Sequence, residues 1–126
     1  MPLRLYNTLS GTIDELFPMD GKSLRMYACG PTVYDYGHIG NFRTFLQVDI
    51  LRRTLKLLGT EIRHVMNITD VDDKIIRNAA AADIPIDKYT APFEEAFLDD
   101  LEVLRVERPE ILARATHTIF PAWWSW

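Results

Sequence analysis

Apolar side chains recur every three or four positions from Phe42 to Leu58, and this spacing predicts an amphipathic helix. Further apolar residues widen the stripe, so we expect this helix to be packed on more than one side. Gly59 follows at the position where a helix-ending glycine belongs. Basic residues in the last turn suit the negative end of the helix dipole.

Short, largely apolar runs on both sides of this helix predict two strands. The first is Leu24 to Ala28 and the second is Glu61 to Ile68, and turn-forming residues bound both. A strand, a helix of about five turns and a second strand form a crossover unit, in which the two strands are parallel neighbours in one sheet. The sequence therefore predicts an α/β fold.

The remaining elements are weaker. Leu3 to Tyr6 and Thr12 to Phe17 are short strand candidates separated by turn-forming residues. After the second parallel strand, acidic residues lead into a helix that begins near Lys74, and Pro85 with its neighbours interrupts it. A third helix is predicted from Tyr89 to Leu104.

Length and composition narrow the class of protein. A chain of 126 residues is about one domain, and no run approaches the roughly 18 apolar residues that span a bilayer. We therefore expect a soluble, cytoplasmic protein without a membrane partner. One cysteine excludes an internal disulfide and fits a reducing compartment. The net charge of -4 argues against this piece holding a nucleic-acid backbone on its own.

The end of the chain is unusual. Residues 119–126 place all three tryptophans within the last four positions. We expect residues 1–118 to form the domain, and the tryptophan-rich tail to reflect a truncation or a shift in reading frame.

The stretch from Met26 to Thr44 combines a strand, a Gly30-Pro31 turn and a helix start. In open α/β folds this order builds a nucleotide pocket beyond the carboxyl end of the strand. His38, with Gly40 allowing close backbone approach, can bind a phosphate oxygen, and Asn41 adds an amide. The alternative is that Asn41 is only a helix N-cap and His38 only a loop histidine.

Cys29 lies at the start of the same turn. It can be a small buried thiol, a nucleophile with His38 as its base, or one ligand of a zinc ion. The other histidines, His64 and His117, lie at no familiar metal-ligand spacing from it.

The acidic run from Thr69 to Asp73 has three carboxylates in four positions. Such a group can hold Mg²⁺ or a substrate amine. We favour the simpler interpretation, in which Thr69 or Asp70 caps the next helix while Asp72 and Asp73 complement its dipole. Thr69 and Asp70 are then expected at the same sheet edge as Cys29 and His38.

Two long segments resemble one family. The segments are CGPTVYDYGHIGNFRTF and NITDVDDKII, and ERPEILARATHTI follows near the end. Together they resemble the amino-terminal part of the catalytic domain of cysteinyl-tRNA synthetases, which are class I aminoacyl-tRNA synthetases. The resemblance implies a partial Rossmann-type (HUP-like) parallel sheet with flanking helices. It also implies activation of L-cysteine with ATP and Mg²⁺, transfer of the cysteine to tRNA(Cys), and a monomeric parent enzyme.

The resemblance also implies roles for single residues. Cys29 matches the first of four ligands of a catalytic zinc that binds the substrate thiolate. His38 to Asn41 match the ATP-binding His-Ile-Gly-His element, with Asn41 in place of the last histidine. The implied sites are catalytic (His38, Asn41), ATP- or adenylate-binding (Gly30, His38, Gly40, Asn41) and cysteine-binding (Gly30, Thr32, Thr69).

The other zinc ligands, the Lys-Met-Ser-Lys-Ser loop and the anticodon-binding region of this family lie downstream of the chain. We therefore expect the chain alone to bind no zinc tightly and to have no aminoacylation activity. One alternative is the related cysteine ligase of mycothiol synthesis, which lacks the Asn-Phe-Arg-Thr of residues 41–44 and typically has proline where this chain has Lys74. The other alternative is a non-catalytic binding module that docks to a partner through residues 123–126.

Overall fold

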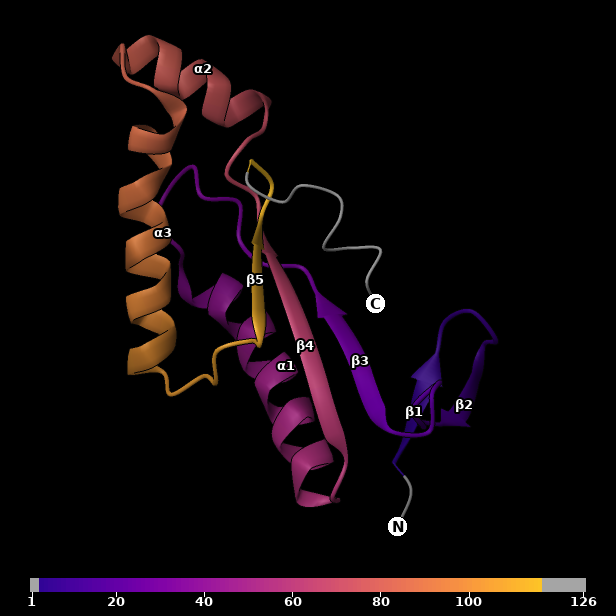
Figure 1. The fold of residues 1–126 in the computed structure, drawn as a ribbon. Helices are drawn as coiled ribbons and strands as arrows, with labels where there is room; N and C mark the ends of the chain where they lie inside the picture. Colours follow the sequence, from indigo (N-terminus) through magenta and orange to yellow (C-terminus); the bar gives the residue numbers. More distant parts are fainter. Residues whose placement is uncertain (1–2, 117–126) are drawn as a thin grey trace.

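The computed structural model describes residues 3–116, so the tryptophan-rich tail and His117 lie outside the described residues. In this described part of the chain, eight elements follow one another (Figure 1). They are β1 (Arg4–Asn7), β2 (Thr12–Glu15), β3 (Ser23–Ala28), α1 (Ile39–Leu57), β4 (Glu61–Ile68), α2 (Asp73–Ala82), α3 (Ile86–Val103) and β5 (Ile111–Arg114). Within this range no helix has both the length and the apolar character needed to cross a membrane.

The strands form two separate sheets. β1 and β2 pair as an antiparallel hairpin, and β3, β4 and β5 form a parallel sheet in that order. α1 connects β3 to β4, as predicted, and α2 with α3 connects β4 to β5. The α/β class with a parallel sheet is therefore confirmed. β5 was not predicted, because its four residues follow a proline and carry a charge at their end.

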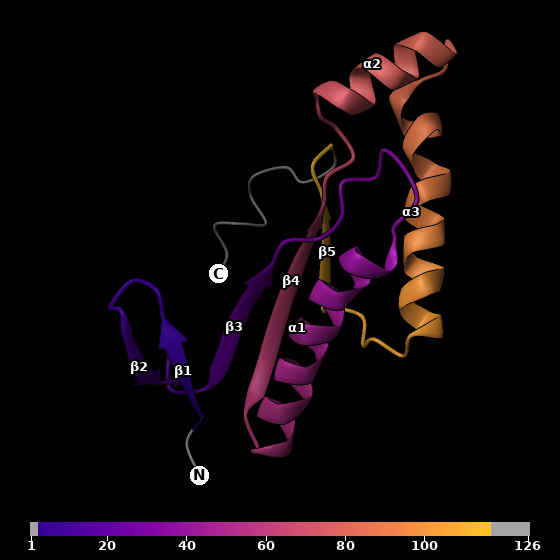
Figure 2. The ribbon, with the colours of Figure 1, turned by 180° about the vertical axis from the view of Figure 1, so that it is seen from behind.

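α1 and α3 cover the same face of the parallel sheet, and Figure 2 shows both in front of it. The main core cluster joins aromatic and aliphatic residues of these helices to β4 (Phe42, Phe45, Met66, Phe97, Leu101 and Val106). The rings of Phe45 and Phe97 meet edge to face, with centroids 5.0 Å apart. This packing fixes the start of α1 against α3 and the sheet.

α1 begins three residues earlier than predicted and ends as predicted. Gly59 has a φ of +81°. Its N–H donates to the carbonyl of Lys56 at 3.0 Å, and the N–H of Thr60 donates to the carbonyl of Leu55 at 3.0 Å. These two bonds are those of a glycine-terminated helix end, and a glycine tolerates the positive φ without strain.

The expectation that α1 is packed on more than one side is wrong. Ile50 and Leu57 are 62% and 87% exposed, whereas Asp49 and Arg52 are buried. Nη1 of Arg52 donates to the carbonyl of Glu107 at 2.7 Å, and Nη2 donates to Oε1 of Glu110 at 2.8 Å. The buried face of α1 is therefore partly polar, and it is tied to the connection between α3 and β5.

His64 is buried in β4 next to this polar group. Neither of its ring nitrogens has a hydrogen-bond partner within the described residues. Burial, followed by the positive charge of Arg52, lowers the pKa of His64 from its ordinary value of 6.5 to about 4. A neutral, buried His64 is thus part of the folded state.

The prediction of a break around Pro85 is confirmed. α2 ends at Ala82, and its C-cap residue, Asp83, adopts the left-handed conformation with a φ of 55°. α3 starts directly after Pro85, three residues before the predicted start at Tyr89. Proline suits a helix start because it has no N–H to leave unpaired.

Candidate functional site

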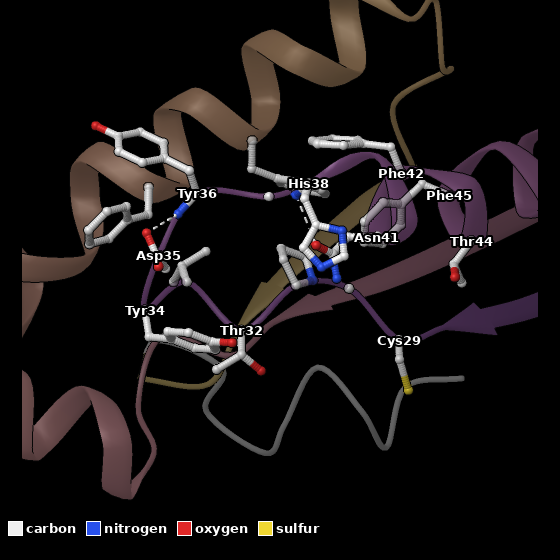
Figure 3. A pocket seen from close by; sticks show the side chains of 16 residues that line it. Cys29, Thr32, Tyr34, Asp35, Tyr36, His38, Asn41, Phe42, Thr44 and Phe45 are labelled. Carbon is white, nitrogen blue, oxygen red and sulfur yellow. Dashed lines mark hydrogen bonds between the residues drawn. The ribbon is translucent and has the colours of Figure 1, made fainter.

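A pocket of about 470 Å³ lies beyond the carboxyl end of β3, where the chain crosses from the strand to α1 (Figure 3). Residues 29–38 form one wall, the first turns of α1 form another, and Phe93 and Phe97 of α3 contribute the rest. The carboxyl ends of parallel strands are where open α/β sheets bind their ligands. This pocket is therefore the candidate functional site.

Most of the residues singled out from the sequence line this pocket (Cys29, Gly30, Thr32, His38 and Asn41). Gly40 and Thr69 are not among its lining residues. Thr69 is nevertheless adjacent, because its N–H donates to the carbonyl of Pro31 at 2.9 Å and its carbonyl accepts from Val33 at 3.1 Å. The pairing of β3 with β4 thus continues past the end of β3, through a bridge between Thr32 and Thr69.

The side chains of His38 and Asn41 both accept hydrogen bonds from backbone N–H groups at the start of α1. Nδ1 of His38 accepts from the N–H of Gly40 at 3.0 Å, and the N–H of His38 donates to Oδ1 of Asn41 at 2.9 Å. His38 is therefore the N-cap, and the alternative in which Asn41 is the N-cap is wrong. Because Nδ1 accepts a hydrogen bond, the proton of the neutral imidazole lies on Nε2, which is left as a donor.

Gly40 makes this arrangement possible. A Cβ at this position would lie 2.8 Å from Cε1 and 3.0 Å from Nδ1 of His38. The ring can therefore lie over the helix start only because residue 40 has no side chain.

Cys29 is exposed, so the alternative in which it is a small buried thiol is wrong. Figure 3 shows its sulfur pointing away from the ring of His38, although both residues line the same pocket. A nucleophile and its base need hydrogen-bond contact, so the arrangement does not support a thiol nucleophile activated by His38. The thiol is instead accessible at the edge of the pocket.

Asn67 of β4 was missed by the sequence analysis. Its Oδ1 accepts from the N–H of Gly30 at 3.0 Å and from the hydroxyl of Tyr27 at 2.9 Å. Its Nδ2 donates to Oγ1 of Thr69 at 3.0 Å. Burial, with a further effect of neighbouring Cys29, raises the pKa of Tyr27 above its ordinary value of 10, which keeps its hydroxyl protonated. The only signal in the sequence was an amide in an otherwise apolar strand end.

An aromatic group from α3 holds the loop that precedes His38, and this too was missed. The hydroxyl of Tyr89 donates to the carbonyl of Tyr34 at 2.9 Å and accepts from Nδ2 of Asn78 at 2.9 Å. The ring of Phe93 meets those of Tyr36 and Tyr89 edge to face, at centroid distances of 5.1 and 5.4 Å. These contacts fix residues 34–36 against the helices rather than leaving them as a free loop.

A family model describing the catalytic domain of class I (C) tRNA synthetases matches residues 15–122. The chain belongs to this family. The cysteine–tRNA ligase of Koribacter versatilis (strain Ellin345) is 60% identical over 119 residues, which are 94% of this chain and 24% of the relative. The cysteine–tRNA ligase of Solibacter usitatus (strain Ellin6076) is 57% identical over 94% of the chain and 26% of its own length. That of Protochlamydia amoebophila (strain UWE25) is 50% identical over 94% of the chain and 25% of its length.

The family resemblance inferred from the sequence is thus confirmed. The three-stranded parallel sheet with its helices agrees with part of a Rossmann-like class I synthetase domain. The chain spans about a quarter of the length of the curated relatives that it matches.

The zinc site implied by the resemblance can be tested against the residues of this synthetase-family chain. Within residues 3–116 no three His, Cys, Asp or Glu side chains lie close enough together to hold a metal ion. Both ring nitrogens of His64 are buried, whereas Cys29 is exposed. The described residues therefore do not form a zinc site by themselves, since such a site needs about four ligands.

The acidic run after β4 has structural partners. Asp72 is the N-cap of α2 and accepts from the N–H of Ile75 at 2.7 Å, so the prediction that Thr69 or Asp70 is the cap is wrong. Asp70 is buried, and its carboxylate accepts from the N–H of Thr116 at 3.0 Å and from the hydroxyl of the same residue. Asp73 lies in the first turn of α2, where its negative charge complements the helix dipole as expected. The arrangement therefore does not support a Mg²⁺ site in this run.

Proposed function

We propose that the chain forms part of a cysteine–tRNA ligase that activates L-cysteine with ATP to cysteinyl-adenylate and transfers the cysteine to tRNA(Cys). The observation that carries the proposal is the shared pocket of Cys29 and His38 beyond β3, in a chain 60% identical to a protein named cysteine–tRNA ligase. We further propose a cytoplasmic, monomeric parent enzyme.

The start of α1 is the proposed ATP-binding element. A helix N-terminus offers unpaired N–H groups and a partial positive charge to phosphate oxygens. Nε2 of His38 adds a donor next to it, and Gly40 allows the close approach of the ring. Asn41 holds the backbone of His38 in place, so its proposed role is to position the histidine.

The end of β3 is the proposed cysteine-binding element. Gly30 and Thr32 line the pocket, and Thr69 is paired with Thr32. Cys29 offers one thiol ligand, so the proposed zinc requires ligands from outside this chain, and the chain alone is expected to bind zinc weakly. Mg²⁺ would arrive with ATP as part of the substrate.

A chimaera tests the proposal. Residues 1–116 are joined to the corresponding downstream part of the Koribacter versatilis relative, and cysteine-dependent exchange between ATP and pyrophosphate is measured. We expect exchange from the chimaera and none from the 126-residue chain alone. His38→Ala should lower the exchange rate by roughly 100-fold, because a donor to the developing charge is lost.

Arg63→Ala, at an exposed position of β4, is the control and should leave the rate unchanged. A chimaera without cysteine-dependent exchange, or one that tolerates His38→Ala, would contradict the proposal. Exchange without charging of tRNA would point instead to a ligase that passes cysteine to a different acceptor.

A further inference from the structure

We propose that Asn67 prepares the cysteine-binding element in two ways. It fixes the turn on both sides of Cys29, and it orients the hydroxyl of Thr69 so that this hydroxyl donates a hydrogen bond to the substrate cysteine. This inference rests on the proposed function. It assigns to Asn67 a positioning role.

The orientation of the Asn67 carboxamide follows from its neighbours. The N–H of Gly30 can only donate, so the amide atom that it meets at 3.0 Å is the oxygen. The same oxygen accepts from the hydroxyl of Tyr27 at 2.9 Å. The amide nitrogen therefore faces Oγ1 of Thr69, at 3.0 Å. A flipped amide would place two N–H groups against each other, which excludes it.

This orientation decides what Thr69 can offer to a ligand. Because Nδ2 of Asn67 donates to Oγ1 of Thr69, the hydroxyl proton of Thr69 takes no part in that bond. It remains available to an acceptor, and on L-cysteine the acceptors are the carboxylate oxygens and the thiolate. The backbone of Thr69 is fixed by its bonds to Pro31 and Val33, so the hydroxyl is held at a defined position.

The same carboxamide restrains Cys29 from both sides. Tyr27 and Gly30, which bracket the cysteine in the chain, are bound to one oxygen of one side chain. The backbone of Gly30 also lies so close to β4 that a Cβ would be 1.8 Å from the carbonyl oxygen of Asn67. Cys29 therefore projects from a turn with little freedom to move.

Two substitutions separate the two parts of this role. Asn67→Ala removes both the acceptor for Gly30 and the donor to Thr69. Asn67→Asp keeps an acceptor for Gly30 and Tyr27, but a carboxylate can only accept, so the hydroxyl of Thr69 must donate to it. The aspartate variant should thus keep the turn and lose the donor offered to cysteine.

The kinetic experiment uses the chimaera described above. We expect Asn67→Asp to raise the KM for cysteine by at least tenfold in the exchange assay while the KM for ATP stays within twofold. Thr69→Val should raise the KM for cysteine as much as Asn67→Asp does, whereas Thr69→Ser, which keeps the hydroxyl, should have the KM of the parent. The double variant Asn67→Asp/Thr69→Val should have a KM for cysteine no higher than that of either single variant. Gln47→Glu, the same amide-to-carboxylate change at an exposed position of α1, is the matched control.

A purely structural role of Asn67 would change both KM values or neither. A cysteine KM within twofold of the parent in Asn67→Asp would overturn the inference. A further loss when Asn67→Asp is added to Thr69→Val would also overturn it, because the effect would then come from the new charge.

A second measurement does not depend on enzyme activity. Amide hydrogen exchange of Gly30 in the 126-residue chain should be slow in the parent and in Asn67→Asp, and at least tenfold faster in Asn67→Ala. Equal exchange in all three would overturn the restraint on the turn. If the parent chimaera lacks activity, the proposed function fails, whereas the exchange of the Gly30 amide still tests the role of Asn67.

Discussion

Replacing Gly30 with alanine should severely destabilise the chain, because the end of β3 lies directly against β4. The new Cβ would be 1.8 Å from the backbone oxygen of Asn67 and 2.8 Å from Cγ of Met66. Carbon and oxygen atoms in close contact are about 3.3 Å apart, so the two strand ends would have to separate by about 1.5 Å. This movement is costly because the backbone of residue 30 and the backbone of Asn67 would have to separate, whereas a flexible side chain could simply rotate away.

The size of the effect follows from what the movement breaks. Overpacking of a tight site costs about 1–3 kcal/mol, and the lost bond from Gly30 to Asn67 adds about 1 kcal/mol. The free energy of unfolding should therefore fall by about 3 kcal/mol or more, out of a total on the order of 10 kcal/mol for a chain of this size. The melting temperature should drop by roughly 10 °C or more.

Urea unfolding followed by far-ultraviolet circular dichroism measures this difference. Gly59→Ala is the matched control, because nothing lies within 4 Å of its Cβ position and only its φ of +81° opposes the substitution. That strain costs about 1–2 kcal/mol. A Gly30→Ala variant no less stable than Gly59→Ala would refute the close approach of the two strand ends.

Three further predictions concern other parts of the chain. Between pH 7 and pH 5 the free energy of unfolding should fall by about 2 kcal/mol, because His64 takes up a proton near its ordinary pKa when unfolded but only at about 4 when folded. Stability is thus lost as the pH falls, and His64→Gln should remove most of this slope in urea unfolding. Gly40→Ala should displace the ring of His38, lower stability by about 1 kcal/mol and abolish exchange in the chimaera; unchanged exchange would contradict the assignment of the helix start. Tyr89→Phe should cost about 1 kcal/mol through the bond to Tyr34, and thermal unfolding indistinguishable from the parent would argue against that anchor.

The regular elements were predictable where their apolar periodicity was strong. β4 was predicted with its observed bounds, and the end of α1 at Gly59 followed from glycine chemistry. The start of α1 was placed too late, because its cap is His38, a residue type that seldom caps helices. Caps made by an uncommon side chain depend on geometry that a sequence pattern does not reveal.

β5 illustrates a different limit. Its residues are held by pairing with β4 and by the packing of its neighbours, and its own pattern is too short to predict a strand. Pairing between distant segments can override local preference. The third strand was therefore found only from the structure.

The site was predicted at the level of its location. Cys29 and His38 were expected at one sheet edge, and both line the same pocket. The roles of the acidic residues could not be predicted from the sequence, because Asp70 and Asp72 have similar neighbours in the sequence but different hydrogen-bond partners in the structure. Asn67 was overlooked because one amide in an apolar strand carries no signal until its three partners are known.

The buried Arg52 has a consequence for how the chain is made on the ribosome. Its carbonyl and carboxylate partners, Glu107 and Glu110, follow it by 55 and 58 residues. Until they are synthesised, seating α1 on its strands would bury a cation without oxygen partners, which costs several kcal/mol. We therefore expect nascent chains that stop short of residue 110 to lack a stable fold, so that α1, the parallel strands and the segment after α3 fold as one unit rather than in stages.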